Sequence, residues 1–157
     1  MNNPPYEPLD ILLSYSHYTL QNRAFELFCP HFLERAKVEQ LVIASPFSMG
    51  LLTSKTPKWH PAPQELLKVK EDALGLCEDW EGGLPDLALG FSLREGEDKM
   101  REIPRVVGLS SLQEVHAAIK AWRQVRDGQD TKRLEKENAV KNIFKNVGLE
   151  GYSWQSP

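Results

Sequence analysis

Two polar segments, each directly after a short apolar run, hold the residues of this chain that are best suited to contact a ligand. The first follows residues 41–44 and contains Ser45, Pro46, Ser48 and Gly50. Hydroxyl groups can hydrogen-bond to a ligand, proline fixes a turn, and glycine lets a ligand approach the backbone closely. A generic connection between a strand and a helix carries the same residue types, so that alternative stays open.

The second polar segment follows residues 105–108 and leads into a helical pattern. Ser110 and Ser111, with the acidic or amide residues after them, offer a capping box in either of two registers.

The apolar pattern predicts three strands that alternate with helices. The run at residues 41–44 is short, continuous and β-branched, which is typical of a parallel strand covered on both faces. We expect strands at residues 9–15, 41–44 and 105–108. The expected helices are 22–36, kinked or split near Pro30, then 66–80, 84–93, about 112–126 and 131–147. This order predicts an α/β fold with parallel strands joined by right-handed crossovers.

The length and composition of the chain limit the classes of protein to which it can belong. The 157 residues fit one domain, with an irregular arm at residues 1–8 and an irregular tail at 148–157. A net charge of -3 without a basic stripe argues against nucleic acid as a partner. No apolar run approaches a membrane span and no signal-peptide pattern is present, so we expect no membrane partner and a cytoplasmic location. Cys29 and Cys77 lie in apolar helical patterns without metal-ligand spacing, which predicts buried thiols and no metal site.

A sheet of three strands would leave two long apolar edges without a partner. Natural domains avoid such edges because they template association with other chains. The pattern therefore predicts a portion of something larger, whose strand edges could self-associate or pair with a missing half.

Three segments carry a resemblance to a known family. They are LDILLSYSHY, VIASPFSMGLLTSKTPKWHPAP and PRVVGLSSLQEV, and the most specific piece is ASPFSMGLL followed by KWHPAP. The chain resembles the aldo-keto reductases over nearly its whole length, within the branch of L-galactose dehydrogenases and fungal NAD-dependent D-arabinose 1-dehydrogenases. The resemblance implies the C-terminal portion of a (β/α)8 TIM barrel, with about three βα units and a terminal helix. The expected strands would be the sixth, seventh and eighth of that barrel.

The resemblance also implies a function, an NAD(P)-dependent aldose 1-dehydrogenase that oxidises D-arabinose or L-galactose. The family's catalytic Tyr, Lys, Asp and His lie in the first half of the barrel, and no residue of this sequence matches any of them. No catalytic residue is therefore assigned, and we expect the chain alone to be inactive. The alternative is a non-catalytic nucleotide-binding or protein-interaction module derived from the same fold.

The resemblance also implies that this chain contains half of the family's nucleotide-binding site. The residues that would run along the nicotinamide riboside and pyrophosphate are Ser45, Pro46, Phe47, Gly50 and Leu51. Gly108, Ser110 and Ser111 would hold the adenosine end, where the free N–H groups and the positive dipole end of the following helix favour phosphate oxygens. Simple helix capping explains Ser110 and Ser111 as well, and capping and phosphate binding can coexist. Glu114 would repel a 2'-phosphate and could accept hydrogen bonds from ribose hydroxyls, which predicts NAD in preference to NADP.

Overall fold

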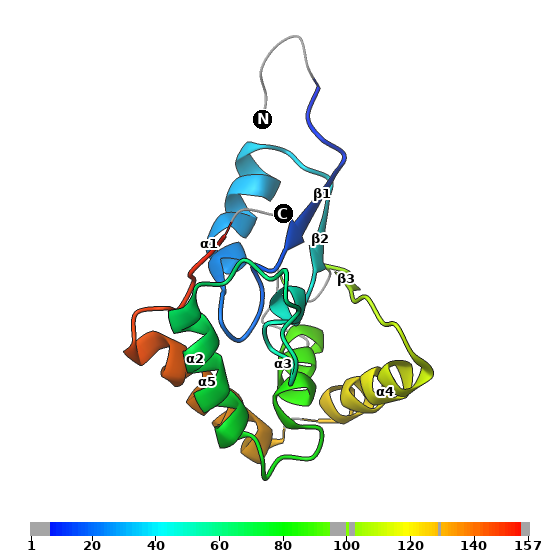
Figure 1. The fold of residues 1–157 in the computed structure, drawn as a ribbon. Helices are drawn as coiled ribbons and strands as arrows, with labels where there is room; N and C mark the ends of the chain where they lie inside the picture. The colour runs from blue at the N-terminus through cyan, green and yellow to red at the C-terminus, as the bar shows by residue number, and fades with distance from the viewer. Residues whose placement is uncertain (1–6, 95–99, 101–102, 129, 155–157) are drawn as a thin grey trace.

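Three parallel strands run through the centre of the molecule (Figure 1). The computed structural model describes residues 7–94, 100, 103–128 and 130–154. The strands are β1 (Ile11–Tyr15), β2 (Gln40–Ala44) and β3 (Arg105–Val106), in that order across the sheet. β1 pairs with β2 from Ile11 opposite Gln40 to Tyr15 opposite Ala44. The α/β class with parallel strands is thus confirmed.

The last strand is shorter than the sequence predicts, because residues 107–108 were expected to continue it. Ile43 and Ala44 pair with the two residues of β3, and β2 ends there. Ser45 then turns the chain away with a φ of 60°. Residues 107–108 therefore have no strand beside them and form an extended segment outside the sheet.

The first helical segment is divided at Pro30, as predicted. α1 spans Ala24–Pro30, and the chain continues directly as the π-helix η1, His31–Arg35. Proline has no N–H to donate to the preceding turn, so regular α-helical bonding cannot continue through it. Phe25 and Cys29 of α1 are buried in the same cluster as Leu41 and Ile43 of β2, so α1 covers one face of the sheet.

Four longer helices complete the fold (Figure 1). They are α2 (Gln64–Leu76), α3 (Gly83–Leu93), α4 (Leu112–Arg126) and α5 (Thr131–Asn146). α2 ends before the predicted Trp80, because Cys77 adopts non-helical backbone angles. α3 is buried along most of its length and packs against α2, α4 and α5, so it is the central helix of the core.

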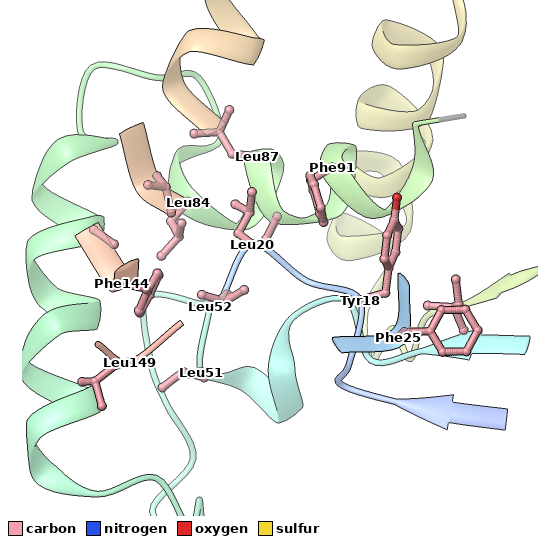
Figure 2. Close-up of a cluster of buried hydrophobic side chains, with 14 of the residues drawn as sticks. Tyr18, Leu20, Phe25, Leu51, Leu52, Leu84, Leu87, Phe91, Phe144 and Leu149 are labelled. Carbon is pink, nitrogen blue, oxygen red and sulfur yellow. The ribbon is translucent and has the colours of Figure 1, made fainter. Parts of the chain in front are cut away.

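The main core lies between α2, α3, α5 and the loops that follow β1 and β2 (Figure 2). Figure 2 shows Leu51 and Leu52 in the same cluster as Leu84 of α3 and Phe144 of α5, and all four side chains are fully buried. Cys29 and Cys77 are buried thiols that form no disulfide, as expected, and burial raises the pKa of Cys77 to about 11. No helix in the described part of the chain is long and apolar enough to cross a bilayer.

Candidate functional site

The two predicted ligand-binding segments begin at the same edge of the sheet. β2 and β3 are parallel neighbours, so the loop at residues 45–52 and the segment at residues 107–111 both leave from their C-terminal ends. Phe47 packs against the small buried cluster of Leu89, together with Val107 and Leu109. The structure therefore brings the two segments together at this cluster.

The loop at residues 45–52 is closed by its own hydrogen bonds. The N–H of Met49 donates to the Ser45 hydroxyl over 2.8 Å, and the N–H of Ser48 donates to the Ser45 carbonyl over 3.0 Å. The N–H groups of Gly50, Leu51 and Leu52 likewise donate to carbonyls of residues 47–48. The N–H groups of residues 48–52 are therefore all hydrogen-bonded within the loop.

The side chain of Leu51 is turned away from the predicted cofactor surface. The 3-10 turn η2 (Ser48–Gly50) directs Leu51 and Leu52 into the core, where both side chains are 0% exposed (Figure 2). Ser48 is equally buried, and its hydroxyl donates to Thr19 over 3.1 Å. The predicted contact of Leu51 with a cofactor stays a prediction, and its side chain is committed to the core.

The two glycines of the predicted site have different surroundings. Gly50 has a φ of +95°, and a Cβ there would lie 2.8 Å from Cδ of Pro57. The fold alone thus requires glycine at position 50. A Cβ at Gly108 would meet nothing within 4 Å, and Gly108 does not have a positive φ. Position 108 therefore offers open space beside the start of α4.

The hydrogen bonds at the start of α4 show which of the two predicted capping registers is formed. Ser111 is the N-cap, because its hydroxyl accepts from the N–H of Glu114 over 3.2 Å. The Glu114 carboxylate reaches back and accepts from the N–H and hydroxyl of Ser110. These bonds hold the pKa of Glu114 below its usual value, so a full negative charge occupies the end of the helix that would attract phosphate.

A cavity of about 170 Å³ lies at the C-terminal end of β1. The residues that line it are Tyr15, Ser16, His17, Asn22, Met49, Tyr152, Ser153 and Trp154. None of these side chains carries a fixed charge. Ser16 is buried with a φ of 61°, and its hydroxyl has no hydrogen-bond partner among the described residues. Aromatic rings and neutral polar groups thus define the chemistry of this cavity.

The C-terminal tail forms one wall of the cavity, which the sequence did not predict. Residues 148–154 contain no helix or strand, as expected, yet they are held against the loop after β1. The Gln21 side chain donates to the carbonyls of Leu149 and Tyr152 over 2.9 and 3.0 Å, and the Gln21 backbone carbonyl accepts from the N–H of Gly151 over 2.8 Å. Trp154 donates its indole N–H to the sulfur of Met49 over 3.1 Å. The tail is therefore part of the candidate site.

Two histidines near the site have identifiable roles. His60 is 8% exposed, and its Nε2 donates to the Ser48 carbonyl over 2.9 Å while its Nδ1 accepts from the N–H of Ala62. Both ring nitrogens are thus used to hold the loop. His17 lines the cavity and bonds to the Ser153 hydroxyl over 3.2 Å. Within the described residues, no group of three or more His, Cys, Asp or Glu side chains could hold a metal ion.

The chain is similar in sequence to two known dehydrogenases. No family model matches the chain. It is 31% identical over 150 residues to L-galactose dehydrogenase of Arabidopsis thaliana, a match that covers 94% of this chain and 45% of that protein. It is 31% identical over 151 residues to D-arabinose 1-dehydrogenase of Saccharomyces cerevisiae, covering 94% and 44%. The chain thus spans less than half the length of these relatives. Both matches point to the aldo-keto reductase family, as the sequence motifs predict, and this chain corresponds to a part of each dehydrogenase.

Proposed function

We propose that this chain carries the NAD-binding loops of a dehydrogenase that oxidises a small sugar. The observation that carries the proposal is that the loop after β2 and the segment before α4 pack against the same cluster, and that this segment has open space at Gly108 and a carboxylate, Glu114, bonded to Ser110. When bound, the cofactor would supply a nicotinamide that accepts hydride. The chain's own part would be to hold and orient the nucleotide.

The residues present fit NAD better than NADP. A 2'-phosphate beside Glu114 would meet a carboxylate whose charge is stabilised by Ser110, and like charges repel. Ribose hydroxyls could instead donate to that carboxylate, as in other NAD sites that use an acidic residue. At the pyrophosphate, the N–H groups of residues 48–52 are already bonded within the loop and would not reach a ligand, so we expect a modest affinity.

The cavity at the end of β1 supports a neutral sugar as the substrate. Its volume of about 170 Å³ is well below the roughly 300–1,000 Å³ typical of sites for drug-sized ligands, so it suits a small molecule. Tyr15 and Tyr152 offer aromatic faces for the C–H surface of a sugar ring. The buried Ser16 hydroxyl has no hydrogen-bond partner among the described residues. A hydrogen bond to a ligand, where rotation of the side chain permits it, would offset the cost of burying this group.

We expect the chain alone not to turn over a sugar. No residue matches the family's catalytic Tyr, Lys, Asp or His, and neither lysine nor aspartate lines the cavity to adjust the pKa of Tyr15 or Tyr152. The measurement is reduction of NAD by the purified chain with D-arabinose and with L-galactose. Turnover comparable to that of an intact dehydrogenase would contradict this part of the proposal.

Gly108→Ala tests the nucleotide site directly. The added methyl meets nothing in the protein, so the thermal unfolding midpoint should stay unchanged. If a nucleotide approaches the backbone here, NAD affinity should fall about tenfold, because the methyl occupies the space of the ligand. Calorimetric titration measures the affinity, and Gly75→Ala in α2, also in open space and without a positive φ, is the control. Unchanged NAD binding in Gly108→Ala would argue against this segment as the nucleotide site.

A further inference from the structure

The loop at residues 45–52 has a strained backbone. Ser45, Ser48 and Met49 have φ values of 60°, 49° and 60°, in the left-handed region that residues other than glycine rarely adopt. Such residues keep this conformation only where their surroundings hold them in it, and they are found most often at functional sites and ligand-binding loops. The contacts that hold this loop are therefore candidates for a functional role.

Side chains from three other segments of the chain hold Ser48 and Met49. The Ser48 hydroxyl donates to Thr19 over 3.1 Å, and the Ser48 carbonyl accepts from Nε2 of His60 over 2.9 Å. The Met49 sulfur accepts from the indole N–H of Trp154 over 3.1 Å. The last of these contacts links the loop to the C-terminal tail, 105 residues further along the chain.

Trp154 supports the loop at two points. Besides its bond to Met49, the indole ring makes a T-shaped contact with the ring of His60, and the ring centroids are 4.8 Å apart. Because His60 bonds to Ser48, Trp154 contacts Met49 directly and supports Ser48 through His60. Met49 and Trp154 also line the cavity after β1, so Met49 has its backbone in the loop and its side chain at the cavity.

The backbone that carries Trp154 is itself fixed. The Gln21 side chain and backbone bond to residues 149–152, and His17 bonds to the Ser153 hydroxyl over 3.2 Å. These bonds tie the tail to the segment after β1 as far as the residue before Trp154. The indole can therefore hold the loop from a fixed position.

We propose that Trp154 is a positioning residue for the loop at residues 45–52. Its indole N–H, through the sulfur of Met49, holds the loop in the conformation to which the nucleotide binds, and the identity of that nucleotide as NAD rests on the proposed function. Without this bond, the strained residues would relax toward ordinary backbone angles for part of the time. The apparent affinity for NAD would then fall with the fraction of molecules that keep the competent conformation.

Amide hydrogen exchange without NAD tests whether Trp154 holds the loop. Trp154→Phe removes the N–H and keeps an aromatic ring, so the amides of residues 48–52 should exchange about three- to tenfold faster relative to those of α2. Trp80→Phe is the matched control, because Trp80 also donates its indole N–H, to Asp86 over 2.8 Å and outside the loop. It should leave the relative exchange of residues 48–52 unchanged.

Two substitutions of Met49 separate the hydrogen bond from packing. Met49→Leu keeps an apolar side chain without an acceptor, and it should speed exchange as Trp154→Phe does. Met49→Gln supplies a carbonyl oxygen that can accept from the indole, so its exchange should stay close to that of the unaltered chain. The double variant Met49→Leu with Trp154→Phe should show no larger effect than either single variant, because both remove the same bond.

Calorimetric titration with NAD tests whether the held conformation is the one that binds. Trp154→Phe and Met49→Leu should bind NAD about three- to tenfold more weakly than the unaltered chain, and Trp80→Phe and Met49→Gln should bind it as the unaltered chain does. Absence of NAD binding to the unaltered chain would overturn the proposed function, while the exchange results would still show whether Trp154 holds the loop. The role of Trp154 is overturned if Trp154→Phe leaves the loop amides unchanged or if Met49→Leu and Met49→Gln behave alike. It is also overturned if faster exchange in Trp154→Phe comes with unchanged NAD affinity.

Discussion

Arg94→Ala should lower the free energy of unfolding by about 3–5 kcal/mol, the usual cost of removing one partner from a buried ion pair. Arg94 at the end of α3 donates to the carboxylate of Glu137 on α5, and the Glu137 side chain is 1% exposed. Burial raises the pKa of Glu137, and Arg94 opposes that shift. Without the guanidinium, a buried carboxylate would lose the bond that stabilises its charge.

Lys120→Ala is the matched control for this effect. Lys120 pairs with Glu81 on the surface, where the two side chains are 51% and 79% exposed. Exposed pairs contribute at most about 1 kcal/mol, so the control should be nearly neutral. The double variant Arg94→Met with Glu137→Leu should recover much of the loss, because neither side chain then needs a partner. Equal urea midpoints for Arg94→Ala and Lys120→Ala would show that this pair does not hold α3 against α5.

Gly50→Ala should destabilise the chain by about 1–3 kcal/mol through backbone strain, with a further loss from a steric clash. The strain arises because Gly50 has a φ of +95°. The clash arises because the new Cβ would lie 2.8 Å from Cδ of Pro57. Equilibrium unfolding in urea measures the loss of stability. The slope of the free energy of unfolding against urea concentration, the m value, should not change if the denatured state is unaffected.

Gly148→Ala separates the two causes. Gly148 has a φ of +73°, yet a Cβ there would meet nothing within 4 Å. It should therefore show the strain without the clash. If Gly50→Ala lowers the free energy of unfolding no more than Gly148→Ala does, Pro57 moves aside freely. The loop at residues 45–52 would then deform more easily than its hydrogen bonds suggest.

The elements of the fold were largely predictable because they depend on local chemistry. A proline such as Pro30 interrupts α-helical hydrogen bonding by its own chemistry, whatever surrounds it. Ser111 followed by Glu114 is a capping box that can be recognised in the sequence alone. The length of β3 was not predictable in this way. It depends on where β2 stops, and β2 stops because Ser45 takes a positive φ that the sequence does not reveal.

The candidate site was predictable in its location and less so in its details. The motifs led to the loops after β2 and β3, which the structure places side by side through Phe47. The inward direction of Leu51 follows from a 3-10 turn, and the role of the tail follows from its bonds to Gln21, more than a hundred residues away in the chain. Tertiary contacts of this kind leave no pattern in the local sequence. The large side chains of Leu149, Tyr152 and Trp154 in this short tail were the available signal.

Calorimetric titration of the chain with NAD and NADP, repeated with Glu114→Gln, tests the central claim most directly. We expect NAD to bind and NADP to bind about tenfold more weakly, because Glu114 keeps its negative charge at neutral pH. The Gln variant removes that charge and should bring the two affinities within about threefold of each other. Tighter binding of NADP than of NAD to the unaltered chain, or binding of neither, would contradict the account.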